Sequence, residues 1–306
     1  MRNVLIYSED TSLAVEILTA GKKVGVVKAV CINDEEQAAL LAEKGVEVYA
    51  IQQNDLVMAD SGAVANILQQ VAAQLHCPVI LISSNRRGKL LAGRLAQKIN
   101  AGCLTGINNL RVDDGKIICE RNVLGGAVIA EQIITREAQV LAVLPKSFPA
   151  AEKADGGSIH AIGVSGTATG ITLLSTLPKR GDAVDISAAE TLFVVGQGIE
   201  SQDDLLAIEA IAKAVNGEVA CTKPVATDRK WFSEDRIIGI SGKSCKPTLA
   251  VLLGVSGQVQ FYAGIREAKT IVTINFNENA PIMSMADYLL NADLNEVVPA
   301  LKDILA

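Results

Sequence analysis

The chain has 306 residues, of which 49% are hydrophobic and 20% are charged, a balance that predicts a soluble globular protein of about two domains. Aromatic residues make up only 3%, so aliphatic side chains must fill the core, as they do between parallel strands that helices cover on both faces. The 28 Lys and Arg against 34 Asp and Glu give a net charge of −6, which argues against a protein that binds nucleic acid phosphates.

In the first half of the chain, short β-branched runs alternate with helical patterns. The runs that predict strands are residues 3–7, 26–32, 46–51, 78–83 and 140–145. The segments that predict helices between them are residues 11–23, 34–45, 59–76 and 87–100. This alternation predicts a doubly wound parallel sheet of the α/β class, with right-handed crossovers.

An Asp-Gly turn interrupts this pattern. Asp114-Gly115 lies between two alternating runs, which predicts an antiparallel hairpin added to the first sheet. Residues 146–166 are rich in Ser, Pro, Ala, Gly and Lys, and we interpret them as irregular. A second series of strands and helices begins near Ala189, so we expect an N-terminal α/β domain at 1–186 and a C-terminal domain at 187–306.

The second half contains four apolar runs that each end in small or polar residues. They are 192–195 before Gly196-Gln197-Gly198, 237–240 before Ser241-Gly242, 249–253 before Gly254 to Gly257, and 270–274 before Asn275. A helix capped near Ser201 follows the first run. We predict strands for all four runs. In a parallel sheet the ends of such strands share one edge, where ligands bind and helix N-termini accept phosphate.

Each of these features is weak alone. The G-x-G at 196–198 lacks the third glycine of the dinucleotide fingerprint, because residue 201 is Ser. Gly242-Lys243-Ser244 is similar to the end of a P-loop, but Ile237 stands where the first glycine of that motif belongs. A P-loop NTPase is therefore disfavoured.

Cysteines and histidines limit metal and nucleophile chemistry. The closest of the six cysteines are Cys103 and Cys119, so no pair has the spacing of a zinc or iron–sulfur site. Only His76 or His160 is available for a Ser-His-Asp triad. We expect no metal site, no catalytic site, and unpaired thiols in a reducing cytoplasm.

Nothing in the sequence predicts membrane insertion. The start, MRNVLIYSEDTS, turns acidic at Glu9 and Asp10 after a very short apolar run, which is unlike a signal peptide. No apolar run reaches the roughly 18 residues that a membrane-spanning helix needs. We expect a cytoplasmic protein.

Taken in order, the segments of the second half resemble the α subunit of electron transfer flavoproteins, and the likeness extends over nearly the whole chain. Residues 254–264 are similar to the family's G-I-S-G-x-x-Q-H-x-x-G segment, residues 270–288 to its T-I-x-A-I-N-x-x-x-x-A-P-I-F-x-x-A-D-Y signature, and residues 292–301 to its closing A-D-L-x-x-V-V-P-x-L. Residues 84–96, residues 221–226 and Trp231 are most like the FixB branch.

The resemblance implies a Rossmann-like FAD-binding second domain and a heterodimer with a β subunit. Such a protein carries electrons between a dehydrogenase, of the acyl-CoA type or similar, and a downstream acceptor. It has no substrate-converting site of its own, so the lack of an acid–base or nucleophile constellation is what the family predicts.

The resemblance also implies which residues contact FAD. Thr222 stands where the family has a serine on the cofactor, Ser241 where it has a threonine near flavin N5, and Asp293 where it has an acidic residue near the adenosine end. The full set is Gln197, Thr222, Lys223, Ile238, Gly239, Ile240, Ser241, Ser256, Gly257, Gln258, Val259, Gln260, Phe261, Asn275, Asp293 and Leu294.

Four positions depart from the family pattern. The arginines of G-R-G and S-R are Gln197 and Lys223, the Gln of Q-T is Ile240, and the His of Q-H is Phe261. Fewer cations and donors disfavour a reduced, negatively charged flavin, so we expect a lowered potential or weakened FAD binding. The alternative is a nucleotide-binding α/β subunit that has lost redox-active FAD and has a structural or regulatory role.

Overall fold

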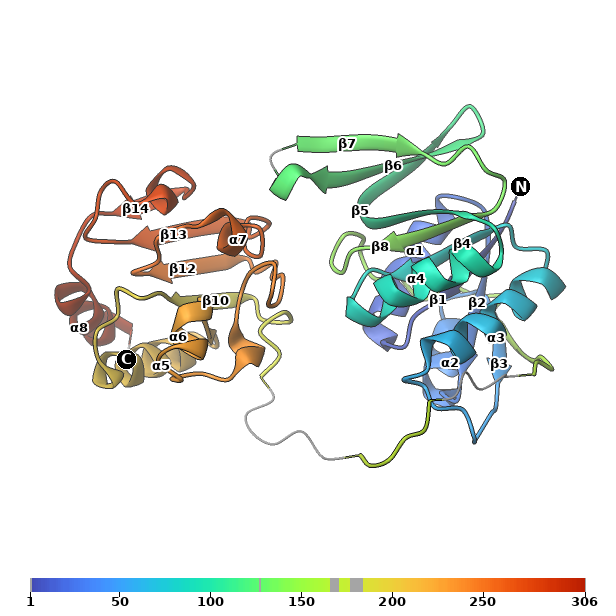
Figure 1. Cartoon of the computed structure of the whole chain (residues 1–306), viewed down its shortest axis with the longest axis horizontal. Coiled ribbons are helices and arrows are strands. Elements are labelled where there is room, and N and C mark those ends of the chain that lie inside the picture. The colour runs from blue at the N-terminus through green and yellow to red at the C-terminus, as the bar shows by residue number, and fades with distance from the viewer. Residues whose placement is uncertain (1, 127, 166–170, 177–183, 306) are drawn as a thin grey trace. The chain divides into compact units, whose positions relative to one another are not determined.

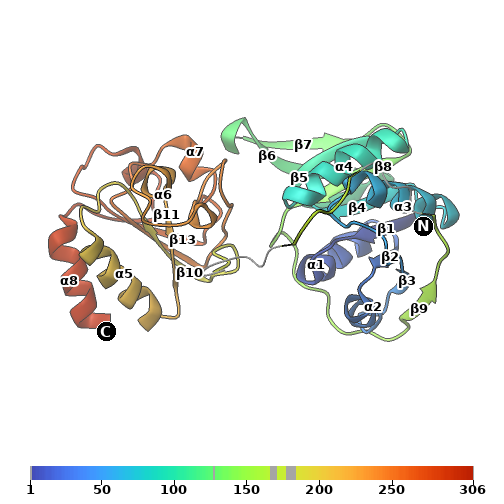
Figure 2. The same ribbon diagram turned by 60° about the horizontal axis from the view of Figure 1, so that its bottom comes forward.

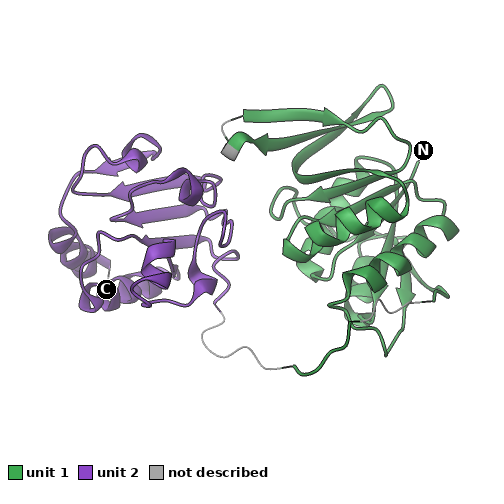
Figure 3. Ribbon diagram, viewed as in Figure 1, with its two compact units in different colours: residues 1–176 green, residues 177–306 purple. Residues whose placement is uncertain are grey.

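The computed structural model describes residues 2–126, 128–165, 171–176 and 184–305, and the chain divides into two compact units, Met1–Thr176 and Leu177–Ala306 (Figure 3). Both units have an α/β fold built on a largely parallel sheet, which confirms the predicted fold class. The domain boundary predicted between residues 186 and 187 lies C-terminal to this division between the two units, and it stays a prediction. Ile186 is fully buried in the core of the second unit.

The first unit is built on a nine-stranded sheet (Figure 1). Its strands are β1 (Asn3–Tyr7), β2 (Val26–Ile32), β3 (Glu47–Ile51), β4 (Val79–Ser83), β5 (Gly102–Asp113), β6 (Lys116–Val123), β7 (Val128–Ile133), β8 (Gln139–Val143) and β9 (Ser158–Ala161). Their order across the sheet is β7-β6-β5-β8-β4-β1-β2-β3-β9. All neighbours pair in parallel except β5 with β6 and β6 with β7.

Four helices cover the two faces of this sheet. They are α1 (Thr11–Lys22), α2 (Glu35–Ala42), α3 (Ser61–Gln74) and α4 (Arg86–Lys98). Each begins where a short polar side chain accepts a hydrogen bond from a backbone N–H of the first turn, as N-caps do, at Asp10, Asp34, Asp60 and Asn85. One face packs against α1 and α2 and the other against α3 and α4.

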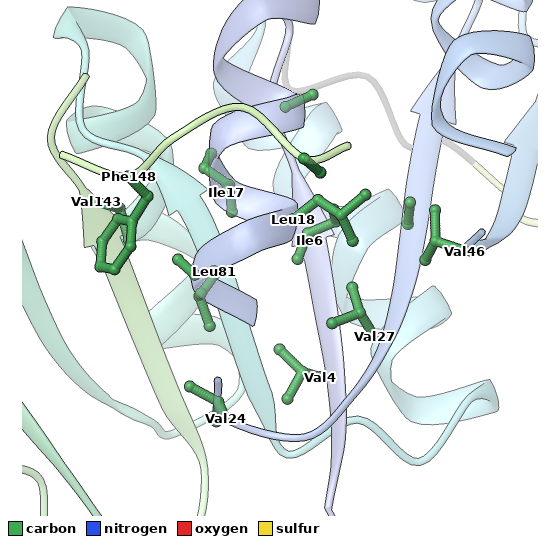
Figure 4. Close-up of a cluster of buried hydrophobic side chains, with 14 of the residues drawn as sticks. Val4, Ile6, Ile17, Leu18, Val24, Val27, Val46, Leu81, Val143 and Phe148 are labelled. Carbon is green, nitrogen blue, oxygen red and sulfur yellow. The ribbon is translucent and has the colours of Figure 1, made fainter. Parts of the chain in front are cut away.

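The core between α1 and the sheet is mostly aliphatic, as the low aromatic content predicts, with Phe148 at its edge as an aromatic member. In Figure 4, Ile17 and Leu18 of α1 lie against Val4 and Ile6 of β1 and Leu81 of β4. Each of these five side chains is at most 2% exposed.

The hairpin predicted at Asp114-Gly115 joins β5 to β6, and both turn residues have positive φ angles, 45° and 70°. A third antiparallel strand, β7, was not predicted. Strand β9 was not predicted either. It lies inside residues 146–166, which we interpreted as irregular, and it pairs with β3. Both β7 and β9 are edge strands with mostly exposed residues, so backbone pairing holds them and no alternation of buried and exposed side chains marks them.

The second unit has a five-stranded, all-parallel sheet with the order β11-β10-β12-β13-β14. Its strands are β10 (Thr191–Val195), β11 (Glu218–Cys221), β12 (Leu249–Leu253), β13 (Thr270–Ile274) and β14 (Tyr288–Leu290). The helices are α5 (Gln202–Ala214), α6 (Lys223–Thr227), α7 (Val259–Tyr262) and α8 (Leu294–Leu305). Short 3-10 turns occur at Glu234–Arg236 and Pro281–Ser284 in this unit, and at Leu124–Gly126 in the first. Helices α5 and α8 lie side by side (Figure 2) and bury one face of the sheet.

One predicted strand is wrong. Residues 237–240 form no strand and make only isolated bridges, Cys221 with Ile237 and Ile238 with Lys243. Gly239, at φ 138°, turns the chain out of an extended course. Ile237 and Ile238 are only 4% and 2% exposed. The apolar pattern at residues 237–238 therefore indicates burial and not strand pairing.

Candidate functional site

The second sheet changes the direction of its winding at β10. The chain passes from β10 through α5 to β11 on one side, and then returns to β12 on the other. A crevice is expected where two such strands end, because the connections leave in opposite directions. The loops at that place begin with Gly196 after β10 and with Gly254 after β12.

These two loops contact each other through their backbones. The Gly196 N–H donates to the Leu253 carbonyl at 2.8 Å, and the Gly198 N–H donates to the Gly254 carbonyl at 3.0 Å. A Cβ on Gly198 would lie 2.7 Å from the Gly254 Cα, and Gly254 itself has φ 63°. Only glycine permits this close approach of the two backbones, which explains why a glycine directly follows each of the two strands.

A cavity of about 300 Å³ opens beside these loops, at the lower end of the size range of small-molecule sites. Most of the predicted site residues line it: Gln197, Thr222, Lys223, Ile238, Gly239, Ile240, Ser241, Ser256, Gly257, Gln258, Gln260 and Phe261. Pro224, Gly254 and Val255 also line it and were not predicted. The sequence could have predicted Gly254 and Val255 as lining residues, because both directly follow the buried strand β12.

Four predicted residues lie outside this lining. Val259 is the first residue of α7 and is 58% exposed, and Leu294 is buried below Gly254. Asn275 is buried, and its Nδ2 donates to the Val255 carbonyl at 2.8 Å, so it holds the loop after β12 in place. The Asp293 Oδ1 accepts from the N–H of the second residue of α8 at 2.9 Å. A cofactor contact by these four residues stays a prediction.

The polar groups around the cavity suit an anion. Among the described residues that line it, Lys223 is the only one with a charged side chain. No described residue accepts a hydrogen bond from the backbone N–H groups of Ser256, Gly257 or Gln258. The Thr222 hydroxyl makes no capping bond to α6. A phosphate group needs such free donors, and no carboxylate in the lining would repel it.

Other reactive groups near the cavity are occupied or uncharged. Burial raises the pKa of the Cys221 thiol to about 12, so it stays protonated at neutral pH. The Lys243 ammonium pairs with Asp185 at 3.0 Å. Burial opposes ionisation of Asp185, but hydrogen bonds from Ser187 and Lys243 outweigh it and lower the pKa of the Asp185 carboxyl. In the described part of the chain, no group of His, Cys, Asp and Glu is arranged to hold a metal ion.

The first unit offers much less room at its own switch point, between β1 and β4. The cavity there has a volume of about 10 Å³, enough for a single water. Arg87 and Glu9, both among its lining residues, pair at 2.8 Å. Of these two crevices, only the one in the second unit has the volume of a small-molecule site.

No described helix has both the length and the apolar character that crossing a bilayer requires. This finding agrees with the absence of a long apolar run in the sequence.

Comparison with known proteins gives matches to both units. The family model for the "Electron transfer flavoprotein FAD-binding domain" matches residues 185–266, and the model for the "Electron transfer flavoprotein domain" matches residues 10–166. Protein FixB of Escherichia coli O6:K15:H31 (strain 536 / UPEC) is 31% identical over 309 residues, which cover 99% of this chain and 98% of the relative. Protein FixB of Shigella flexneri matches with the same identity and coverage. The structure of MurG from Acinetobacter baumannii covers 100% of this chain and 91% of its own at 11% identity, but its TM-score of 0.34 carries no argument.

Proposed function

Because this chain belongs to the electron transfer flavoprotein α family and carries the FAD-binding domain of that family, we propose that it is the FAD-carrying subunit of a heterodimer with a β subunit. Its role is electron transfer. The finer proposal is that it receives electrons from a dehydrogenase of the acyl-CoA type or similar and delivers them to a downstream acceptor in the cytoplasm. None of the six cysteines forms a disulfide, which supports that location.

The observation that carries the proposal is the cavity at the switch point of the second sheet. Every residue that lines it falls between Gln197 and Phe261, inside the segment that matches the FAD-binding domain. The Lys223 ammonium and the backbone N–H groups of residues 256–258 suit the pyrophosphate of FAD. The residues present therefore fit this cofactor.

We assign the roles of the lining residues from their chemistry. Lys223 and the free N–H groups of residues 256–258 bind the pyrophosphate. The hydroxyls of Thr222 and Ser241 are available as donors to polar atoms of the cofactor. The apolar side chains of Ile238 and Phe261 exclude water from the cavity floor. When bound, FAD supplies the ability to accept and release one or two electrons, which no side chain of this site has.

The four residues that depart from the family pattern affect the reduction potential of the bound flavin. Gln197 lacks the positive charge of the family's arginine, Ile240 lacks the amide of its glutamine, and Phe261 lacks the imidazole of its histidine. Lys223 keeps a charge but not the planar fork of arginine. Added negative charge on the flavin is less stabilised as a result. We infer a reduction potential below that of relatives that keep those groups.

The proposal is tested on the full chain co-expressed with its β subunit. We expect a yellow complex whose acid-released cofactor has the mass of FAD, in a one-to-one ratio with this chain, and whose visible bands bleach with dithionite. Potentiometric titration of the same sample measures the reduction potential against that of a family member that keeps the arginines, the glutamine and the histidine at these four positions.

A colourless heterodimer that takes up no added FAD would refute this function. The alternative, a subunit that has lost redox-active FAD, would then be supported. A reduction potential equal to that of such a family member would refute only the inference about Gln197, Ile240 and Phe261.

A further inference from the structure

Arg229 lies just after α6, outside the cavity lining, and its side chain reaches the loop after β10. Its Nη2 donates to the Gln197 carbonyl at 3.0 Å, and its Nη1 donates to the Ile199 carbonyl. The guanidinium lies 4.6 Å from the centre of the Trp231 ring, within the range of a cation–π contact. One planar cation thus bonds two carbonyls of a single loop while an aromatic ring holds its orientation.

The peptide unit between Gln197 and Gly198 is consequently fixed at both ends. Its carbonyl accepts from Arg229, and its N–H donates to the Gly254 carbonyl at 3.0 Å. Without Arg229 only the N–H side would be held. Gln197 lines the cavity, so the orientation of this peptide defines part of the cavity wall.

The backbone of Arg229 is bonded to a second part of the cavity wall, the start of α6. Its N–H donates to the Pro224 carbonyl at 3.2 Å, and the Asp228 N–H donates to the same carbonyl at 3.0 Å. Thr222, Lys223 and Pro224 line the cavity. Arg229 therefore connects the wall formed by the loop after β10 to the wall formed by the start of α6.

On the basis of the proposed function, we propose that Arg229 is a positioning residue for FAD. It sets the separation of the two cavity walls, and it engages two carbonyl oxygens that would otherwise add negative potential beside the pyrophosphate. A loop that is already fixed before binding loses less conformational freedom when the cofactor binds. Arg229 acts through this loop and need not touch FAD.

Lysine does not replace arginine in this role. An ammonium carries the same charge, but it lacks the fork that bonds two carbonyls at once and the plane that stacks on Trp231. Arg229→Lys therefore separates the effect of geometry from the effect of charge, while Arg229→Gln removes both.

Arg236 provides a matched control in the same unit. Its Nη1 donates to the Val219 carbonyl at 2.7 Å, and its guanidinium lies 5.7 Å from the centre of the Phe232 ring. It therefore resembles Arg229 in its contacts but bonds no loop of the cavity. Arg236→Gln measures what a lost arginine–aromatic contact costs the fold without changing the cavity walls.

The experiment measures the FAD dissociation constant of the full chain, co-purified with its β subunit, by equilibrium ultrafiltration. We expect Arg229→Gln to raise it about ten- to a hundredfold, as loss of hydrogen bonds from a charged donor does. Arg229→Lys should raise it by about three- to tenfold, and Arg236→Gln by less than about threefold. Emission from Trp231, the single tryptophan, should change in both Arg229 variants and not in Arg236→Gln.

Two results would overturn this inference. One is an Arg229→Gln constant equal to that of Arg236→Gln. Another is an Arg229→Lys constant equal to wild type, since charge alone would then suffice; this comparison decides the matter even if Arg229→Gln does not fold. A wild-type complex without FAD affinity would instead refute the proposed function on which the inference rests.

Discussion

Gly196, Gly198 and Gly254 determine how closely the two loops of the cavity approach each other. Their backbones are joined by hydrogen bonds, and at Gly198 a single added carbon would lie 2.7 Å from the Gly254 Cα. That atom belongs to backbone and not to the end of a flexible side chain, so one of the loops would have to move. At the residue scale, the site depends on the absence of side chains as much as on the polar groups present.

We predict that Gly198→Ala destabilises the second unit by about 1–3 kcal/mol, the usual cost of overpacking. FAD binding should weaken as well, because the displaced loop carries Gln197. Thermal unfolding followed by Trp231 fluorescence, which reports on the second unit, measures the first effect, and equilibrium ultrafiltration measures the second.

Gly93→Ala is the control for this substitution. Gly93 is exposed in the interior of α4, and a Cβ there meets nothing within 4 Å. Alanine in a helix interior should stabilise the first unit by about 0.5–1 kcal/mol and leave the Trp231 transition unchanged. Equal effects of the two substitutions on that transition would show that the loop contact does not matter.

The start of α8 combines a structural and a predicted functional role in one side chain. Asp293 precedes the helix, and its Oδ1 accepts from the Asn295 N–H at 2.9 Å. The family resemblance placed the same carboxylate near the adenosine end of FAD. At the scale of the element, these roles are separable because Asn caps a helix as well as Asp does and Ala does not.

We predict that Asp293→Asn keeps the unfolding temperature of the second unit near wild type and weakens FAD binding about fivefold, as loss of the charge from a hydrogen bond to a ribose hydroxyl would. Asp293→Ala should in addition lower the stability by about 0.5–2 kcal/mol. Thermal unfolding and ultrafiltration of both variants check this. If Asp293→Asn equals wild type in both unfolding temperature and FAD affinity, the prediction is wrong and Asp293 only caps α8.

At the scale of the whole molecule, each unit has its own core. The residues of two buried clusters all belong to the first unit, and the residues of two others all belong to the second. The cavity proposed for FAD is lined entirely by the second unit. A ligand stabilises the part that it binds, so the two units should respond differently to FAD.

We predict two unfolding transitions for the isolated full chain in calorimetry. FAD at a hundred times its dissociation constant should stabilise the second unit by about 2.7 kcal/mol, a rise of roughly 10 °C, and leave the other transition in place. Trp231 fluorescence identifies the transition that moves. A single transition that moves as a whole would contradict independent unfolding of the two units.

The sequence alone determined the α/β class, five of the parallel strands and the four helices of the first unit, and most of the cavity lining. These features depend on local patterns, such as apolar runs, Asp and Asn caps, and glycines after strands, and on motifs that keep their order along the chain. The edge strands β7 and β9 were not predicted because their residues are mostly exposed. A strand was wrongly predicted at residues 237–240 because buried isoleucines occur in buried turns as well as in strands.

Only the tertiary structure showed what binds the loops together. Asn275 holds Val255 across 20 residues, and Arg229 holds Gln197 across 32. No local pattern records such bonds, because their partners are backbone carbonyls, which every residue has. The residue types thus determined which chemistry the cavity offers, while the packing of loops from separate strands decided which side chains line it and which hold it in shape.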